Sequence, residues 1–166
     1  HREITCSHYA SPMAKSSTVD SLDVVMLGAT EVDTSFNVNV HTNSSGVIMG
    51  GSGGHSDAAQ GAKMAMVVAP LIRARLPLIR ERVQCISTPG DTIDVLVTQY
   101  GLAVNPKRMD LVERFKSAHL PVFDIRELKE KAEGLSGKPK QKKPQGKQVA
   151  DVYYRDGTKI DEIMGL

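Results

Sequence analysis

Two short apolar runs decide the fold class: Leu22-Asp-Val-Val-Met-Leu-Gly-Ala29 and Lys63-Met-Ala-Met-Val-Val-Ala69. The first ends at a glycine and the second is followed by Pro70, so both are typical of short buried strands. Between them, Gly50-Gly-Ser-Gly-Gly54 cannot continue a strand or a helix at low free-energy cost, which predicts a tight loop. This order predicts an α/β fold, with a mostly parallel sheet flanked by helices.

The segments outside these runs fit the same architecture. A short helix over 58–62 would be capped by Ser56 or Asp57, whose side-chain oxygens can accept from the first-turn amides. The segment 71–83 is expected to be a loop followed by a strand, because Pro77 interrupts any helix. Apolar patterning predicts further extended pieces at 36–40, 93–97, 102–104 and 121–123, and helices at 108–118 and 124–133.

The C-terminal third carries clear local signals. Asp124 and Glu127 are spaced as a capping box, and Gly134 and Gly137 are expected to end the helix that follows. Asp156-Gly157 between alternating apolar residues predicts a β-hairpin. We therefore divide the chain into a domain over 1–137, a Lys/Pro-rich linker over 138–148 and a hairpin over 149–166.

Composition narrows the function classes. The chain has 166 residues, 40% of them hydrophobic but only 4% aromatic, which suits an aliphatic core around a parallel sheet. It also disfavours single-stranded nucleic-acid binding, which depends on aromatic stacking. The formal charge is +2, yet five lysines lie within 138–147, so the rest of the chain is slightly acidic and offers no basic groove. We expect no nucleic-acid partner.

The remaining compositional signals indicate a soluble intracellular protein. No apolar stretch is long enough to span a membrane, and the chain opens without a signal peptide, so we expect a cytoplasmic location and no membrane partner. Cys6 and Cys85 are expected to be reduced thiols. The five histidines show no metal-ligand spacing, and no metal is expected. Because the chain starts with His1 rather than Met, we expect a fragment of a larger protein.

The glycine cluster is the strongest candidate for a binding site. Amides of Gly50, Gly51, Gly53 and Gly54, followed by His55, could approach a phosphate or a developing oxyanion closely. The alternative is a strand-to-helix turn that is merely tight. Neither a Walker loop nor a complete Rossmann fingerprint is present. A catalytic triad of neighbouring Ser, His and Asp is disfavoured, because triad residues usually converge from separate segments.

Charged residues near the strands are the second group of candidates. Arg73 and Arg75 open a set of four arginines that ends at Arg82, and guanidinium groups match carboxylates through paired donors. The alternative for this set is a solvated strand face. Glu31 and Asp33 follow the first strand, where α/β sites commonly lie. For them the alternative is loop solvation or capping.

Three blocks of sequence resemble the coenzyme A transferases. They are Leu22 to Asp33, Gly46 to Lys63 with its Gly-Gly-Ser-Gly-Gly-His-Ser-Asp core, and Ile86 to Asn105. The last contains Val97-Thr-Gln-Tyr-Gly-Leu-Ala103, with Gln99 where the family usually has Glu. Within this family the sequence is most similar to the citrate lyase alpha subunits, through His55-Ser-Asp57, Val68 to Arg75 and Tyr154 to Thr158. The resemblance covers about 3–137 and the hairpin, but not the Lys-rich segment.

This resemblance implies a citrate CoA-transferase. Citrate would displace acetate from the phosphopantetheine thioester of an acetylated acyl carrier protein, or from acetyl-coenzyme A, and a separate lyase subunit would cleave the citryl thioester. It further implies partners, namely the acyl carrier protein (gamma) and lyase (beta) subunits, and a homo-oligomer. The 50–54 loop would bind the thioester, and Arg73 and Arg75 would bind citrate. Glu31 is the catalytic candidate, although the family's catalytic glutamate usually precedes the part matched here, as does its first domain.

Two alternatives remain open at this point. The protein could be another carboxylate CoA-transferase, using an acceptor such as acetate or 4-hydroxybutyrate. It could instead be a non-catalytic module that docks the acyl carrier protein, with the lysines of 138–147 steering an acidic partner. Whether the protein is a citrate CoA-transferase or another carboxylate CoA-transferase, we expect the fragment alone to be inactive.

Overall fold

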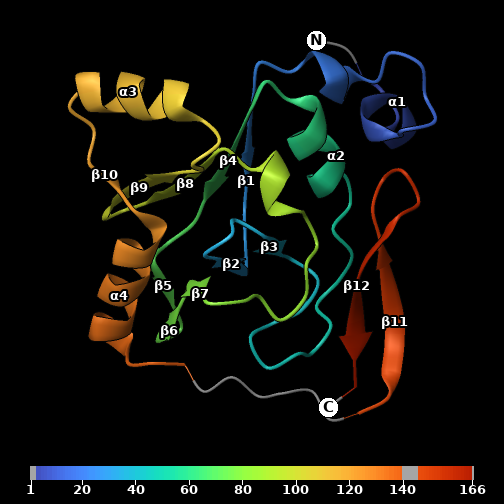
Figure 1. The fold of residues 1–166 in the computed structure, drawn as a ribbon. Helices are drawn as coiled ribbons and strands as arrows, with labels where there is room; N and C mark the ends of the chain where they lie inside the picture. Colours follow the sequence, from blue (N-terminus) through green and yellow to red (C-terminus); the bar gives the residue numbers. More distant parts are fainter. Residues whose placement is uncertain (1–2, 140–145, 166) are drawn as a thin grey trace.

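The computed structural model describes residues 3–139 and 146–165. Most of the segment predicted to be a linker, 140–145, lies outside the described residues, and with it three of the five lysines considered for docking. Figure 1 shows the α/β arrangement, with the C-terminal hairpin on the opposite side of the molecule from helix α4 (Ile125–Ser136).

A five-stranded sheet organises the fold, as the apolar runs predicted. Its order is β1 (Val24–Leu27), β4 (Met64–Val68), β8 (Val95–Thr98), β9 (Gly101–Val104) and β10 (Val122–Phe123). All neighbouring pairs are parallel except β8 and β9, which form a hairpin. The prediction of a mostly parallel sheet is confirmed.

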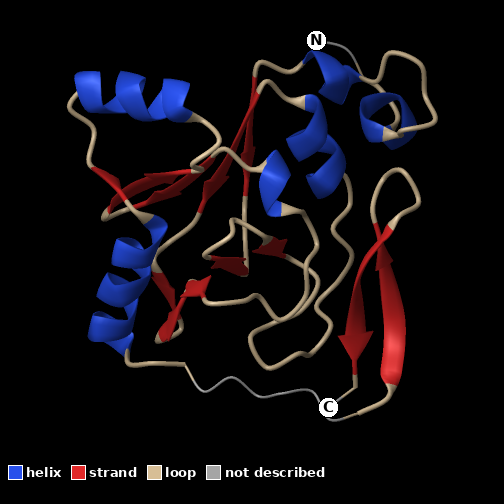
Figure 2. Ribbon diagram, in the orientation of Figure 1, coloured by secondary structure: helices blue, strands red, loops and turns tan. Residues whose placement is uncertain are grey.

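Two smaller sheets lie beside the main one (Figure 2). The first has the order β3 (Val38–Asn39), β2 (Glu31–Asp33) and β7 (Ile79–Arg80), with β2 parallel to β7. The second is a hairpin of β5 (Ile72–Arg73) and β6 (Leu76–Pro77). These sheets bring 30–33 and 71–80 together, although the two segments are far apart in the sequence.

Helices lie on both faces of the main sheet. Besides α4 they are α1 (Cys6–Ala10), α2 (His55–Gly61) and α3 (Met109–Ser117), and there are two 3-10 turns, η1 (Thr18–Ser21) and η2 (Gly90–Thr92). The largest core cluster lies between the main sheet, the three-stranded sheet and α4, and it is aliphatic apart from one phenylalanine in its fully buried part. Its largest buried members are Phe36, Leu71, Leu78, Ile79, Ile93, Leu96 and Leu128.

Helix α4 begins as its sequence predicted but ends later. Asp124 accepts from the amide of Arg126, and the Glu127 carboxylate accepts from the Asp124 amide, so the capping box is confirmed. Gly134 lies inside the helix, and the chain leaves it at Gly137, which has a φ of 83°. The left-handed backbone that favours glycine is needed only at Gly137.

The prediction that Ser56 or Asp57 caps the second helix is wrong. Helix α2 begins at His55 and its cap position is Gly54, which has no side chain to accept a hydrogen bond. Ser56 and Asp57 therefore lie within the first turn. Asp57 instead forms an ion pair with Arg155 of the C-terminal hairpin, with Oδ1 and Nε 3.2 Å apart.

The segment 71–83 contains an additional hairpin that the sequence did not predict. Strands β5 and β6 are joined by Ala74 and Arg75, with φ angles of 49° and 63°. A two-residue turn with both φ angles positive is the favoured hairpin connection, but it usually contains Asn or Gly. Because neither is present, the turn signal was missing. The strand expected after it is β7.

The C-terminal hairpin of β11 (Gln148–Tyr153) and β12 (Lys159–Met164) is confirmed and is packed against the main body. Val152 and Ile163 bury Cys85, and the Asp161 carboxylate accepts from the Ile86 amide at 2.7 Å. Tyr154 donates its hydroxyl to the side chain of Gln60 on α2. The hairpin thus supports the helix that follows the glycine loop.

Candidate functional site

The glycine loop presents unused backbone donors. Within the described residues, no amide from Gly50 to Gly54 donates a backbone or side-chain hydrogen bond that the structure records. A Cβ atom at Gly50 or Gly51 would meet no atom within 4 Å, so packing within this chain does not require glycine there. Gly53 does need it, with a φ of 54°. The loop therefore leaves both space and donors for a group outside the chain, as an anion or oxyanion site requires.

His55 fixes the end of this loop. Its Nε2 lies 2.9 Å from the carbonyl oxygen of Gly28, at the carboxyl end of β1, and its Nδ1 lies 2.7 Å from Oγ1 of Thr88. A carbonyl can only accept, so Nε2 carries the proton and Nδ1 accepts from the Thr88 hydroxyl. Burial lowers the pKa of His55, outweighing the Gly28 contact, which raises it. A neutral imidazole thus joins the loop to β1.

A second histidine lies beside the first. His41 Nδ1 is 2.7 Å from Oγ of Ser87, whose oxygen already accepts from the amides of Val40 and His41. The Ser87 hydroxyl therefore donates to His41. Burial also lowers the pKa of His41. The consecutive residues Ser87 and Thr88 thus orient one histidine each.

A pocket of about 220 Å³ lies between the segment before the glycine loop and the β5–β6 hairpin. The residues that line it include the polar Thr30, Asn43 and Ser45 together with Arg73. Met49, which also lines it, directly precedes the loop. In the part of the chain that the structure describes, the Arg73 guanidinium has no ion-pair partner. An unpaired guanidinium among hydroxyl and amide groups can bind a carboxylate.

The other predicted arginine lies apart from this pocket wall. Arg75 occupies the hairpin turn and is exposed, beside but not among the lining residues. The structure places Arg73 in the same pocket as Met49, which directly precedes the glycine loop, and it places Arg75 in the turn of the β5–β6 hairpin.

Glu31 is buried in an ion pair. Its Oε1 lies 3.0 Å from Nε of Arg80, and both side chains are at most 5% exposed. Its Oε2 accepts from the Asn39 side chain and the Gln84 amide. This carboxylate joins β2, β3 and β7, and the geometry favours a structural role over the predicted catalytic one.

Asp33 and Gln99, which the sequence singled out, have structural roles, because their side chains accept hydrogen bonds from backbone amides. Asp33 accepts from the amides of Ser35 and Asn37, so its carboxylate organises the turn after β2. Gln99, which stands where the resembling family usually has Glu, accepts from the Leu71 amide at 2.9 Å. It thereby fixes the chain where β4 leads into the β5–β6 hairpin.

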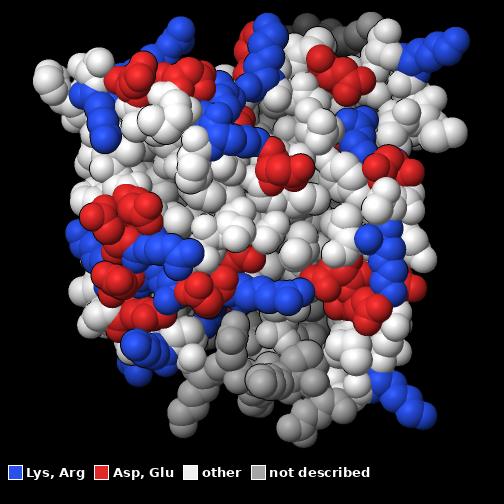
Figure 3. All heavy atoms as spheres, in the orientation of Figure 1, with Lys and Arg blue, Asp and Glu red and all other residues white. Residues whose placement is uncertain are grey.

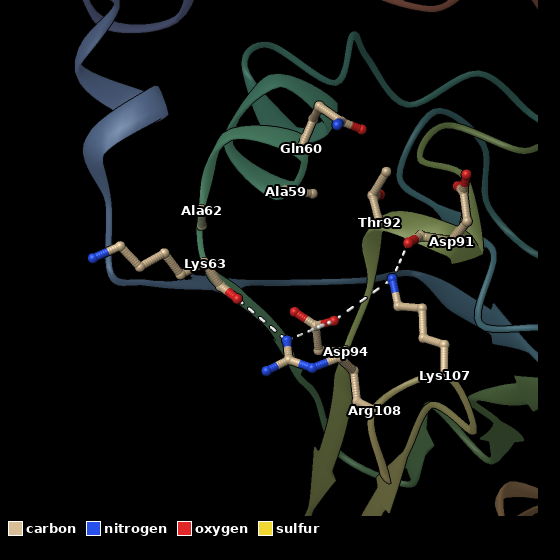
Figure 4. Close-up of a pocket in the computed structure, with 9 residues that line it drawn as sticks. All are labelled: Ala59, Gln60, Ala62, Lys63, Asp91, Thr92, Asp94, Lys107 and Arg108. Carbon is tan, nitrogen blue, oxygen red and sulfur yellow. Dashed lines mark hydrogen bonds and ion pairs between the residues drawn. The ribbon is translucent and has the colours of Figure 1, made fainter. Parts of the chain in front are cut away.

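A further pocket, shown in Figure 4, contains cations that are already paired. Asp94 lies 3.1 Å from Arg108 Nη1 and 3.6 Å from Lys107 Nζ, and it also accepts from the Ala65 amide. Lys63 directs its ammonium away from the pocket, toward Asp23. Asp94 therefore neutralises the cations of this pocket and links their segments, so the pocket is poorly suited to bind an anion. On the face in Figure 3, basic and acidic side chains are likewise interspersed.

Residues 3–139 and 146–165 contain neither a candidate metal site nor a candidate membrane-spanning helix. No group of three or more His, Cys, Asp or Glu is placed to hold a metal ion. No helix described here has the length and apolar character needed to cross a bilayer.

Comparisons with known proteins establish the family. The whole chain, residues 1–166, matches the family described as citrate lyase, alpha subunit (CitF). The chain belongs to the citrate lyase alpha-subunit family. It is 48% identical to the citrate lyase alpha chain of Haemophilus influenzae and 50% identical to that of Klebsiella pneumoniae, over 163 residues in each case. These matches cover 98% of this chain and 33% and 32% of the relatives.

A solved structure gives the same result for the fold. A Streptococcus mutans protein, described as an alpha subunit of citrate lyase in complex with citrate, is 48% identical with a TM-score of 0.95. The match covers 100% of this chain and 32% of that one. The chain thus spans about a third of the length of its alpha-subunit relatives, and the resemblance found in the sequence is confirmed at family level.

Several polar residues around the loop have roles that no sequence motif predicts. Thr88 and Ser87 orient the two histidines, and Thr30 and Asn43 line the pocket that contains Arg73. Asn43-Ser-Ser-Gly46 is a recognisable turn signal, but nothing in it reveals that the turn faces Arg73. These roles depend on contacts between distant segments.

Proposed function

We propose that this chain provides the thioester-binding loop and a carboxylate-binding pocket of a citrate CoA-transferase. One observation carries the proposal: the pocket lined by the unpaired Arg73 is also lined by Met49, the residue that directly precedes the glycine loop and its free amides. His55 attaches the loop to Gly28, and Thr30, two residues later, lines the pocket with Arg73. In α/β proteins the carboxyl ends of parallel strands commonly hold the ligand site.

The reaction would exchange the acyl group on a thiol. A carboxylate oxygen of citrate attacks the carbonyl carbon of the acetyl thioester, and the C–S bond breaks to give an anhydride and a thiolate. The thiolate then attacks the citryl carbonyl, and acetate leaves with the oxygen of the broken C–O bond. Each attack places negative charge on a carbonyl oxygen. Amides of Gly50 and Gly51, which are free in this chain, are suited to stabilise that oxyanion.

The substrate carboxylates would be bound by arginine. Arg73 lines the pocket, and Arg75 at the adjacent turn could reach a second carboxylate. Citrate carries three carboxylates, so two guanidinium groups on one hairpin fit it better than they fit a simple monocarboxylate. The citrate named in the description of the S. mutans structure is consistent with this choice.

The rest of the proposal concerns the whole protein. The donor would be the phosphopantetheine thioester of an acyl carrier protein or of coenzyme A, and the partners would be that gamma subunit and the lyase beta subunit, in a homo-oligomer. Glu31 is buried and paired with Arg80, and the direct attack by citrate needs no glutamate nucleophile, so we assign Glu31 no catalytic role. We expect the 166-residue chain alone to show negligible transferase activity.

The test uses a full-length alpha chain carrying this sequence, with acetyl-coenzyme A and citrate. Arg73→Gln should raise the KM for citrate about tenfold or more, as expected for loss of a charge-assisted hydrogen bond. The KM for acetyl-coenzyme A should change little. Arg114→Gln, which removes an exposed arginine of α3, is the matched control. If the two variants have the same KM for citrate, Arg73 does not bind it.

The acceptor is tested separately in the unmodified protein. Citrate should be used faster than acetate, butyrate or 4-hydroxybutyrate. A higher kcat/KM with one of the monocarboxylates would instead assign the protein to another class of CoA-transferase.

A further inference from the structure

One half of one face of the main sheet is apolar and uncovered. Side chains alternate along β1 and β4, and Val24, Met26, Met64, Met66 and Val68 all point to the same side, because Val24 pairs with Met64 and Met26 with Met66. Met26 is 70% exposed, Val68 47% and Val24 41%. We call these five residues the open half-sheet.

The other half of this face is covered. Helix α3 packs over β9 and β10, and Leu111 joins Val95, Leu102 and Val104 in a buried cluster. Met64 and Met66 lie at the edge of that cluster and are only partly buried. Apolar side chains on this face are therefore less buried with distance from α3, and least buried at β1, the edge strand of the sheet.

Other described segments lie elsewhere. Helix α1 and turn η1 pack with α2 against Val25 and Leu27, which point to the opposite face of β1 (Figure 1). The C-terminal hairpin packs on Cys85. Within residues 3–139 and 146–165, no segment packs over the open half-sheet, whereas sheets with mostly parallel strands usually have helices on both faces.

The length of the relatives indicates what covers it. Full-length citrate lyase alpha chains are about three times as long as this chain, so most of their polypeptide lies outside these residues. We propose that a helix from that remaining part of the alpha chain packs its apolar side on the open half-sheet. This inference rests on membership of the family, and it holds or fails independently of the proposed transfer reaction.

The test measures thiol accessibility at Met26. Met26→Cys is made with Cys6→Ser, so that within these 166 residues the only other cysteine is the buried Cys85, and labelling is read on the peptide that contains position 26. In the native full-length alpha chain, a maleimide should label position 26 at least about ten times more slowly than in the 166-residue chain. Leu135→Cys, at a position on α4 that is 56% exposed, is the matched control and should label equally fast in both.

Three results would overturn the proposal. Equal labelling of position 26 in the two proteins would show that this face stays open. Equal slowing at positions 26 and 135 would indicate general shielding rather than a specific helix. If labelling of position 26 in the 166-residue chain becomes slower as the protein concentration rises, the face is covered by a second copy of the chain.

Discussion

Glu31 and Arg80 form a buried ion pair across the parallel strands β2 and β7, with Oε1 and Nε 3.0 Å apart. Both residues occupy positions that sequence reasoning associates with function, a carboxylate after the first strand and an arginine in a basic cluster. Their burial against each other instead assigns them to the scaffold behind the site.

Breaking this pair should destabilise the fold. Glu31→Gln leaves the Arg80 guanidinium buried without a counter-charge, and we expect the free energy of unfolding in urea to fall by about 3 kcal/mol. The double variant Glu31→Gln with Arg80→Met should recover part of that loss. If Glu31 were catalytic, the single variant in a full-length protein would instead lose activity while its urea midpoint stayed the same.

Removing either partner of the ion pair between Asp57 and Arg155 should lower the free energy of unfolding by a different amount. Burial raises the pKa of Asp57, and Arg155 lowers it only in part, so the charged carboxylate carries a net penalty on folding. Arg155→Met leaves that carboxylate unpaired and should cost more stability than Asp57→Asn, by about 1 kcal/mol. Urea unfolding at pH 7 measures both. Equal losses would mean that the pair is effectively solvated.

Below neutral pH the two half-buried histidines, His41 and His55, should weaken the fold. Folding lowers the pKa of both His41 and His55 through burial, so the unfolded chain binds protons more tightly. Their contribution is complete above the unfolded pKa of about 6.5 and is lost as the pH falls below it. We expect urea stability to fall from pH 7.5 to 5.5, and the slope to be smaller in the double variant His41→Asn with His55→Gln. An unchanged slope would contradict the assigned neutral states.

Gly51 should matter for binding and not for stability. A Cβ atom there meets nothing within 4 Å, so Gly51→Val should leave the unfolding midpoint nearly unchanged while obstructing the space beside the free amides. In a full-length protein its kcat/KM for the thioester should fall about tenfold or more. The comparison is Gly53→Ala, which places a side chain at a φ of 54° and should cost about 1 kcal/mol of stability. Normal turnover by Gly51→Val would exclude the loop from the site.

Only one of the two thiols should react in the native chain. Burial raises the pKa of Cys85 to about 12, with a further contribution from the Asp161 carboxylate. Cys6 is exposed. A disulfide reagent should therefore titrate one thiol in buffer and two in urea. Two reactive thiols in buffer would show that the C-terminal hairpin opens readily.

Local signals predicted most of the fold. The apolar runs placed β1 and β4, the Asp124 capping box placed the start of α4, and Asp156-Gly157 placed the last hairpin. Each of these depends on residues a few positions apart, so the sequence alone contains the information. The glycine loop was identified for the same reason.

The missed features depend on distant contacts or on strained backbone. Asp57 was expected to cap its own helix, but its partner Arg155 comes from the other end of the chain. The role of Thr88 depends on its distance to His55, which no spacing reveals. The β5–β6 turn contains no glycine and therefore gave no signal.

Ala74 and Arg75 adopt left-handed backbone angles that glycine would adopt more easily. With glycines, this turn would sample many conformations and carry Arg73 through many orientations. The side chains of Ala74 and Arg75 narrow that range of conformations, at the expense of some folding stability. The Arg73 guanidinium would then be held in place before a carboxylate binds here, so binding would cost less conformational entropy.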